Sequence, residues 1–254
     1  MSEYTNTSEY QTIGNAPAGS IRFNTDSGKM EIYNGEQWWE IDATSPEQQT
    51  GGTRGLFGGG ETPSLTDRID FINVDTAGNA ADFGDLSFNR RNLKSTSDRT
   101  RMIFTGGYTS GPAVVYNTLE FVTMASTGNT ADFGDLTQDM YQGTAGSNAI
   151  RAIAGAGSYS PSGSLDAGMS FVTIATLGNA TEFGDLAQNH LECGEGACSP
   201  TRIVIPGSFS SNNSPSNKIE YHEIMTTGDF LDFGDLTTNN NGTSGGSNGH
   251  GGLG

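Results

Sequence analysis

A short motif recurs four times in this chain, and each copy lies fifty residues after the one before it. The copies at 82–86, 132–136 and 232–236 read Asp-Phe-Gly-Asp-Leu, and the copy at 182–186 reads Glu-Phe-Gly-Asp-Leu. A fixed period of this length is typical of architectures in which one supersecondary unit is copied and stacked. The chain is therefore expected to fold as four similar units, at about 53–99, 100–149, 150–200 and 201–254.

Each repeat carries the sequence signals of short β-strands. A first strand is predicted after an arginine, and these arginines are Arg54, Arg101, Arg151 and Arg202. A second strand is predicted at the apolar-aromatic segments 69–72, 119–122, 169–172 and 219–222, and the recurring motif carries a third. The turn between the second and third strands, 76–79 in the first repeat, contains glycine and asparagine, which accept positive φ at little cost. A weaker fourth strand is predicted at segments such as 91–95.

The second strand indicates how the repeats pack. Ile69, Phe71, Ile72 and Val74 place apolar groups on both faces of the strand instead of alternating with polar groups. A sheet with two buried faces is expected where copies of the sheet cover each other. The pattern therefore predicts an all-β fold, with a β-propeller of four fifty-residue repeats over 51–254, in which a single repeat does not fold alone.

Residues 1–50 lie outside the repeat and predict a second module. Segments 21–24, 29–33 and 37–41 read as three short strands, and Asn34-Gly35 between the last two is a strong hairpin signal. A β-meander of this size buries too little surface to be stable by itself. Trp38 and Trp39 are therefore predicted to contact another subunit or another protein, or alternatively the first repeat.

Composition excludes several classes of partner. The chain has 254 residues, 37 of them glycine, and 29 acidic against 12 basic residues give a net charge of −17. This charge repels phosphate backbones and anionic lipid surfaces, so nucleic acid is not an expected partner. Residues 1–11 lack the basic and apolar segments of a secretion signal, and no stretch is apolar enough for a spanning helix. We expect synthesis in a cytoplasm and no membrane insertion.

The cysteines Cys193 and Cys198 enclose a short polar loop. Two reduced thiols are the expectation in a cytoplasm, and a disulfide is the alternative after exposure to an oxidising medium. Two ligands do not make a four-coordinate zinc site.

The repeated aspartates and the histidines are the residues to consider for chemistry. Asp-Phe-Gly also occurs in kinases, but four copies at a fixed period indicate architecture, with Asp82 and Asp85 accepting hydrogen bonds from turn amides. Calcium binding by these carboxylates is the alternative. His222 replaces an aliphatic residue of the other repeats and reads as structural, and His190 and His250 complete no catalytic constellation. We expect no catalytic residues, no metal site, no cofactor and no enzymatic activity.

The repeat resembles a known family. Its glycine-rich strand ends, its period and its Asn-Ala-x-Asp-Phe-Gly-Asp-Leu signature are similar to kelch-like repeat proteins of the virions and tail fibres of marine tailed bacteriophages, including cyanophages. The resemblance covers 53–237; it departs from kelch proper because the glycine pair becomes Gly155-Ala156-Gly157 and Pro206-Gly207-Ser208, and no repeat contains tryptophan. Segment 19–41 resembles a small module of phage fibre proteins, where it commonly serves attachment or trimerisation.

Three functions are compatible with these features. The first is a virion structural protein, a tail or neck fibre component or a capsid decoration protein, that assembles with itself, a trimer being favoured, and with other virion proteins. The second is a receptor-binding, lectin-like module whose variable loops 110–116, 158–167 and 209–217 contact host surface glycans. The third is a glycan hydrolase that uses two carboxylates.

Overall fold

A computed structural model describes residues 16–25, 29–40, 52–191, 196–210 and 214–247, and in these residues the protein consists of antiparallel β-sheets. The predicted all-β class is therefore confirmed. The described residues include no helix of the length and apolarity that crossing a membrane requires. The chain divides into two compact units, Met1–Thr50 and Gly51–Gly254.

The N-terminal unit contains a three-stranded meander, as predicted. Its strands are β1 (Ile21–Asn24), β2 (Lys29–Tyr33) and β3 (Trp38–Glu40), which pair in that order. The turn before β3 is fixed by Asn34, whose Oδ1 accepts hydrogen bonds from the backbone N–H groups of Glu36 and Gln37 at 2.8 Å each. Gly35 has a φ of 104°, which explains the Asn-Gly pair at this turn. The predicted end of the third strand, at Ile41, lies outside the described residues.

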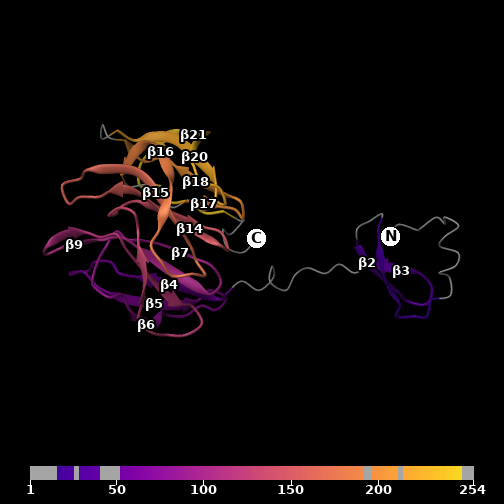
Figure 1. Cartoon of the computed structure of the whole chain (residues 1–254). Helices are drawn as coiled ribbons and strands as arrows, with labels where there is room; N and C mark the ends of the chain where they lie inside the picture. Colours follow the sequence, from indigo (N-terminus) through magenta and orange to yellow (C-terminus); the bar gives the residue numbers. More distant parts are fainter. Residues whose placement is uncertain (1–15, 26–28, 41–51, 192–195, 211–213, 248–254) are drawn as a thin grey trace. The chain divides into compact units, whose positions relative to one another are not determined.

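The second unit contains one sheet for each repeat (Figure 1). Repeat one forms β4 (Arg54–Gly58), β5 (Arg68–Asn73) and β6 (Ala81–Asp85); repeat two forms β7 (Lys94–Ser97), β8 (Arg101–Thr105), β11 (Thr118–Thr123) and β12 (Ala131–Asp135), with an added hairpin of β9 (Tyr108–Ser110) and β10 (Ala113–Val115). Repeat three forms β13 (Thr144–Ser147), β14 (Arg151–Ser158), β15 (Leu165–Thr173) and β16 (Thr181–Leu191), to which β19 (Phe209–Ser210) pairs; repeat four forms β17 (Ala197–Cys198), β18 (Arg202–Pro206), β20 (Ser216–Glu223) and β21 (Leu231–Asn240).

The first strands begin at the four predicted arginines, and the second and third strands fall at the predicted segments. The weak fourth strand needs a correction. It lies at β7, somewhat later than 91–95, and because it pairs with β8 it belongs to the sheet of repeat two and not to that of repeat one. The physical reason is a tight turn in which Asp98 Oδ1 accepts hydrogen bonds from the N–H groups of Thr100 and Arg101, both at 2.7 Å, so that β7 folds back on β8.

The hydrophobic core lies between the repeats and not inside them. We call the face of a sheet that packs on the following repeat its downstream face, and the opposite one its upstream face. In the first of three core clusters, Leu56, Ile69, Phe71, Phe83 and Leu86 form the downstream face of repeat one, and Met102, Phe104, Val122 and Met124 form the upstream face of repeat two. Equivalent clusters join repeats two and three and repeats three and four. The order is visible in Figure 1, where the sheets follow one another from β4–β6 to β20 and β21.

The joints between repeats also share backbone hydrogen bonds. At the first joint, Gly128 N donates to Phe83 O at 2.7 Å and Thr130 N donates to Asp85 O at 2.9 Å. The corresponding bonds recur fifty residues later at 2.8 and 2.7 Å, and again at 2.7 and 2.8 Å. The glycine of the motif permits this approach, because a Cβ on Gly84 would lie 2.3 Å from Gly128 O. The turn of one repeat therefore extends the third strand of the repeat before it.

Candidate functional site

The repeated aspartates lie in the third strands, beside a shift in the register with the second strands. Asp132 Oδ1 accepts a hydrogen bond from Gly134 N, and Asp232 Oδ1 accepts one from Gly234 N, both at 3.1 Å. The backbone N–H of Asp85 donates to Asn129 Oδ1 of the next repeat at 3.1 Å. Phe83 and Leu86 of the same motif are buried. These contacts agree with the architectural interpretation of the motif.

The described residues bring together no group of three or more His, Cys, Asp or Glu side chains that would hold a metal ion. His222 is half-buried, with its ring 4.9 Å from that of Phe183 and its Nδ1 2.9 Å from Glu223 O. This packing agrees with the prediction that His222 has a structural role. His250 lies outside the described residues, as does the side chain of His190.

One buried ion pair lies between repeats one and two and was not predicted. Arg90 Nη2 lies 3.3 Å from Glu120 Oε2, and both side chains are almost completely buried. Burial lowers the pKa of Arg90, and the carboxylate of Glu120 partly offsets this. Thr130 Oγ1 also donates to Glu120 at 2.9 Å, and Ser87 Oγ donates to its other oxygen. Both repeats thus contribute contacts to Glu120, whereas Nε and Nη1 of the buried Arg90 have no hydrogen-bond partner among the described residues. The ion pair with Glu120 is therefore the polar contact that keeps the Arg90 charge in this joint.

Cys198 is a buried free thiol in the cluster between repeats three and four. Burial raises its pKa to about 11, so it is protonated and poorly reactive near neutral pH. Cys193 lies outside the described residues.

The two faces of the N-terminal sheet differ sharply in chemistry. The face that carries Arg22, Asn24, Glu31 and Trp38 is polar, with Glu31 buried, and it is internally bonded: Arg22 Nε donates to Glu31 Oε2 at 2.7 Å, and Asn24 Nδ2 donates to Glu31 Oε1 at 2.8 Å. The Arg22 guanidinium stacks on the Trp38 ring at 4.2 Å. Glu31 is thus held by two hydrogen bonds from side chains of the same face.

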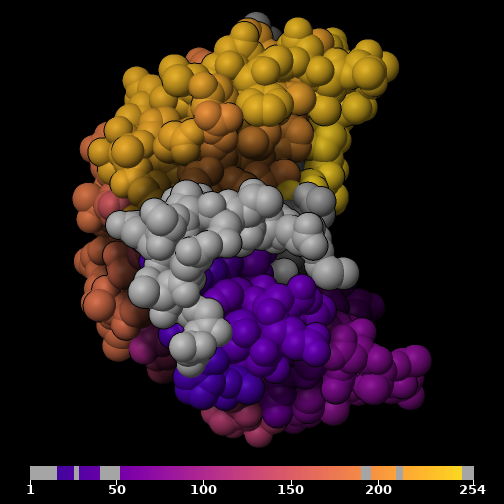
Figure 2. Space-filling view, turned by 90° about the vertical axis from the view of Figure 1, so that its right-hand side faces the viewer, coloured from indigo at the N-terminus to yellow at the C-terminus, as the bar shows by residue number. Residues whose placement is uncertain are grey.

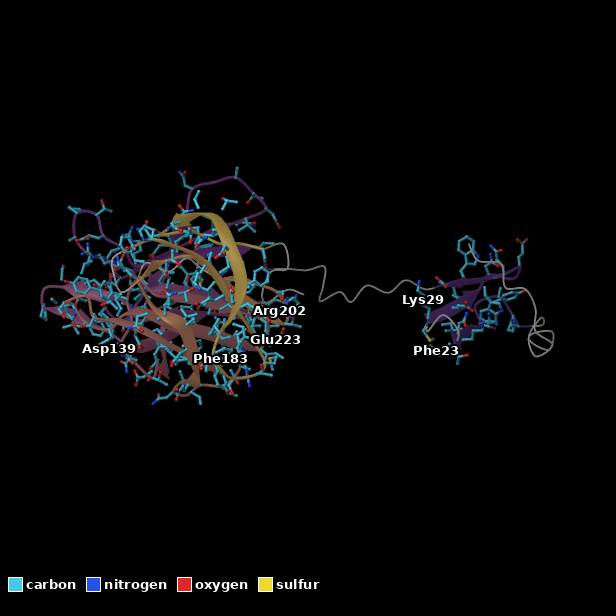
Figure 3. All side chains as sticks on the ribbon, turned by 90° about the horizontal axis from the view of Figure 1, so that it is seen from above. Phe23, Lys29, Asp139, Phe183, Arg202 and Glu223 are labelled. Carbon is cyan, nitrogen blue, oxygen red and sulfur yellow. The ribbon has the colours of Figure 1, made fainter. Side chains whose placement is uncertain are left out.

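The opposite face of the N-terminal sheet is apolar and exposed. Register places Ile21 beside Ile32, Phe23 beside Met30, and Ile32 beside Trp39, so that these side chains form one continuous surface. Phe23 is 59 % exposed and Trp39 is 46 % exposed. Figure 3 labels Phe23 and Lys29 on this unit. We call the surface of Ile21, Phe23, Met30, Ile32 and Trp39 the apolar meander face.

The structure therefore separates the two tryptophans predicted as contact residues. Trp39 lies on the apolar meander face, whereas Trp38 lies on the polar face with its ring 5.2 Å from that of Tyr33. Sequence reasoning overlooked Ile21, Phe23, Met30 and Ile32. The signal was present, because alternate residues along each of these strands are apolar.

No protein-family model matches the sequence, and no curated protein is detectably similar to it.

Proposed function

We propose that this chain is a structural protein of a bacteriophage virion, a tail or neck fibre component or a capsid decoration protein, that attaches through its N-terminal unit and displays its repeats. The observation that carries the proposal is the apolar meander face. An exposed apolar surface on a small three-stranded sheet marks an interaction site, because so small a sheet gains little stability alone. The partner is another copy of the chain, in a trimer, or another virion protein.

The displayed part is a propeller-type arrangement of four sheets that stays open between repeats four and one, where Phe233 and Phe57 are exposed. Three observations support it: both faces of the interior sheets are covered, each joint repeats the same backbone bonds, and the core lies between sheets. The net charge of −17 suits a particle that stays dispersed in salty water. In this role the chain acts by binding, without catalysis, cofactor, nucleic acid or membrane insertion.

The attachment role is tested by the mass of the full chain in solution. The double variant Phe23→Ser/Trp39→Ser removes two aromatic side chains from the apolar meander face. We expect light scattering to show a lower assembly state, or loss of binding to particles that lack the protein. Lys29→Gln is the control, because Lys29 belongs to an exposed ion pair with Glu40 at 2.9 Å. Equal behaviour of the double variant and the wild type contradicts the attachment role.

The virion location is tested separately, by mass spectrometry and antibody labelling of purified particles of the phage that encodes the chain. Stoichiometric presence supports the proposal. Expression during infection together with absence from particles contradicts it.

A second candidate function, recognition of host surface glycans, is favoured by the connections between first and second strands. Repeat two carries the hairpin of β9 and β10, where Tyr108 stacks on Tyr141 with ring centroids 5.3 Å apart. The sequence suggested a loop here; the structure shows a hairpin because Tyr108 pairs with Val115 in antiparallel register. Half-exposed aromatic rings are suited to sugar binding. A glycan array probed with the wild type and with Tyr108→Ala/Tyr141→Ala tests the idea, and the absence of binding by the folded wild type ends it.

A further inference from the structure

The two ends of the repeat array present the two halves of a joint that the array itself forms three times. At each interior joint, the downstream face of one repeat packs on the upstream face of the next. Repeat one has no repeat before it, and repeat four has none after it among the described residues. The array therefore ends in an unmatched upstream face and an unmatched downstream face.

The apolar part of the unmatched upstream face consists of Gly55, Phe57, Ile72 and Val74, and Asp70 lies beside Phe57 on the same face. Phe57 is 61 % exposed, although its equivalents Phe104, Ala154 and Ile205 are buried. Val74 is exposed too, although its equivalents Ile174 and Ile224 are fully buried. The side chains of this face are of the types found in the interior joints, but here they are exposed to solvent.

The unmatched downstream face consists of Val204, Ile219, Tyr221, Phe233 and Leu236. Phe233 is 53 % exposed, whereas the equivalent Phe83, Phe133 and Phe183 are buried under the next repeat. Figure 2 shows repeat four, in yellow, as the outermost layer at one end of the repeat unit.

The backbone of repeat four is already shaped for a further joint. Gly234 has a φ of 139°, close to the 143° and 146° of Gly134 and Gly184. At those two glycines a Cβ would lie 2.4 and 1.9 Å from the carbonyl oxygen of the following repeat, whereas nothing lies within 4 Å of the same point at Gly234. The space that receives a neighbouring turn is open at Gly234.

The polar groups at the two ends are complementary as well. The arginine that begins each repeat reaches across the joint: Arg54 Nη1 donates to Met124 O at 2.8 Å, and Arg101 Nη1 donates to Ile174 O at 2.8 Å. Arg151 does the same to Ile224 O at 3.1 Å. Arg202 occupies this place in repeat four but pairs with Glu223 on its own sheet at 2.5 Å, and both side chains are nearly half exposed (Figure 3). The carbonyl equivalent to its missing acceptor is that of Val74.

A second polar pair follows the same pattern. Ser87 of repeat one donates to Glu120 of repeat two, and Thr137 of repeat two lies 2.5 Å from Ser170 of repeat three. At the ends of the array, the corresponding positions hold Thr237 and Asp70. A hydroxyl thus faces a carboxylate in the joint that the two ends would form.

We propose that the downstream face of repeat four binds the upstream face of repeat one of a second copy of this chain, head to tail. The contact repeats the interior joints: Gly78 N donates to Phe233 O, Ala80 N donates to Asp235 O, and Arg202 turns from Glu223 to Val74 O. The two surfaces differ, so the interface is heterologous. In an open assembly the first copy keeps a free upstream face and the last copy keeps a free downstream face, until a ring closes. This association goes beyond the attachment role of the N-terminal unit and does not depend on it.

The test compares single variants of the full chain by light scattering over a range of concentrations. Phe57→Asp disables the upstream face and Phe233→Asp disables the downstream face. A carboxylate buried without a partner weakens each contact by at least about a hundredfold. We expect the wild type to associate and each variant alone to lose that association. Leu177→Asp is the matched control, since Leu177 is equally exposed but lies in a turn of repeat three away from both ends.

A mixture of the two variants is the decisive sample. Phe57→Asp keeps an intact downstream face and Phe233→Asp keeps an intact upstream face, so together they are expected to form one joint and to exceed the mass of either variant alone. Circular dichroism and thermal unfolding check that each variant is folded, and Val74→Asp and Arg202→Ala replace any variant that is not.

Three results would overturn the proposal: a wild type that shows no association beyond that of the variants, variants that associate like the wild type, or a mixture that gains no mass. Assembly through the apolar meander face is read independently, because it survives Phe57→Asp and Phe233→Asp and is lost in Phe23→Ser/Trp39→Ser.

Discussion

Repeats three and four carry nearly the same motif, yet its phenylalanine meets opposite surroundings. Phe183 is 1 % exposed because repeat four covers it, whereas Phe233 is 53 % exposed. Their arginines differ in the same way, since Arg151 bonds to a carbonyl of repeat four and Arg202 bonds to its own sheet. Burial is thus a property of the joint and not of the motif, as expected where each repeat contacts only its neighbours. The experiments below compare an interior joint with an end, at protein concentrations low enough to keep the ends free.

Truncation of the two phenylalanines gives the largest expected contrast. Phe183→Ala removes a fully buried ring and is expected to lower the free energy of unfolding by about 3–5 kcal/mol. Phe233→Ala removes a ring that is already half in water, so we expect a loss of less than about 1 kcal/mol. Urea unfolding followed by circular dichroism measures both. Similar losses would mean that repeat four is covered by something other than a further repeat.

Alkaline pH tests the joint between repeats three and four through Cys198. Its pKa is about 11 in the folded chain, against 9.0 for the unperturbed thiol, because burial disfavours the thiolate. The folded state then binds the proton more tightly, so the stabilisation is fully present below pH 9 and is lost as the pH rises through about 11. Two pKa units correspond to about 2–3 kcal/mol. We expect the stability difference between the wild type and Cys198→Ala to change by this amount between pH 8 and pH 11, and a constant difference would show that the thiol is accessible.

Alanine substitutions at the motif glycines distinguish the cost of backbone strain from the cost of a steric clash across the joint. Gly134 and Gly234 have similar φ values, 143° and 139°, so Gly134→Ala and Gly234→Ala share the cost of a left-handed alanine. Only at Gly134 does the new Cβ meet a neighbour, the carbonyl of Gly178. We expect Gly134→Ala to cost about 1–3 kcal/mol more than Gly234→Ala in thermal unfolding. Equal costs would show that the backbone yields at the joint.

The asparagines of the turns give the smallest contrast. Asn129 Oδ1 accepts the N–H of Asp85 across the first joint at 3.1 Å, and Asn79 is its equivalent at the free end. Asn129→Ala is expected to cost about 1 kcal/mol, the typical net value of one hydrogen bond. For Asn79→Ala we expect almost no change. The same urea titration measures both free energies of unfolding. A clear loss of stability in Asn79→Ala would show that the upstream end of repeat one is covered.

The strands were predictable because their signals are local. The arginines and glycines mark the first strands, apolar runs mark the second, and the fixed period transfers each assignment to the other repeats. The pairing of β7 with β8 was not predictable in this way, since it depends on whether a weak strand folds back on the repeat before or after it. The turn at Asp98 decides this through two backbone hydrogen bonds.

The sites were less predictable than the strands. The pairing of Arg90 with Glu120 joins residues of two repeats, and neither position is occupied by the same residue type in every repeat. Trp38 and Trp39 are neighbours in sequence, so only the register of β2 and β3 shows which one lies on the apolar face. The ends of the array became visible only when exposure distinguished Phe57 and Phe233 from their buried equivalents.

The polar pairs between the repeats also bear on how such a chain avoids misfolding. Neighbouring units that look alike invite docking in the wrong order, a characteristic failure of repeat proteins. Here the first two joints carry different pairs: a carboxylate with Arg90 at the first and two hydroxyl groups at the second. The third joint again contains a glutamate, Glu220, which accepts a hydrogen bond from Ala187 N. Were repeat three to dock directly on repeat one, Ser170 would replace Glu120 and Arg90 would be buried without a counter-charge, at a cost of several kcal/mol. The pair of Arg90 and Glu120 therefore disfavours the docking of repeat three on repeat one.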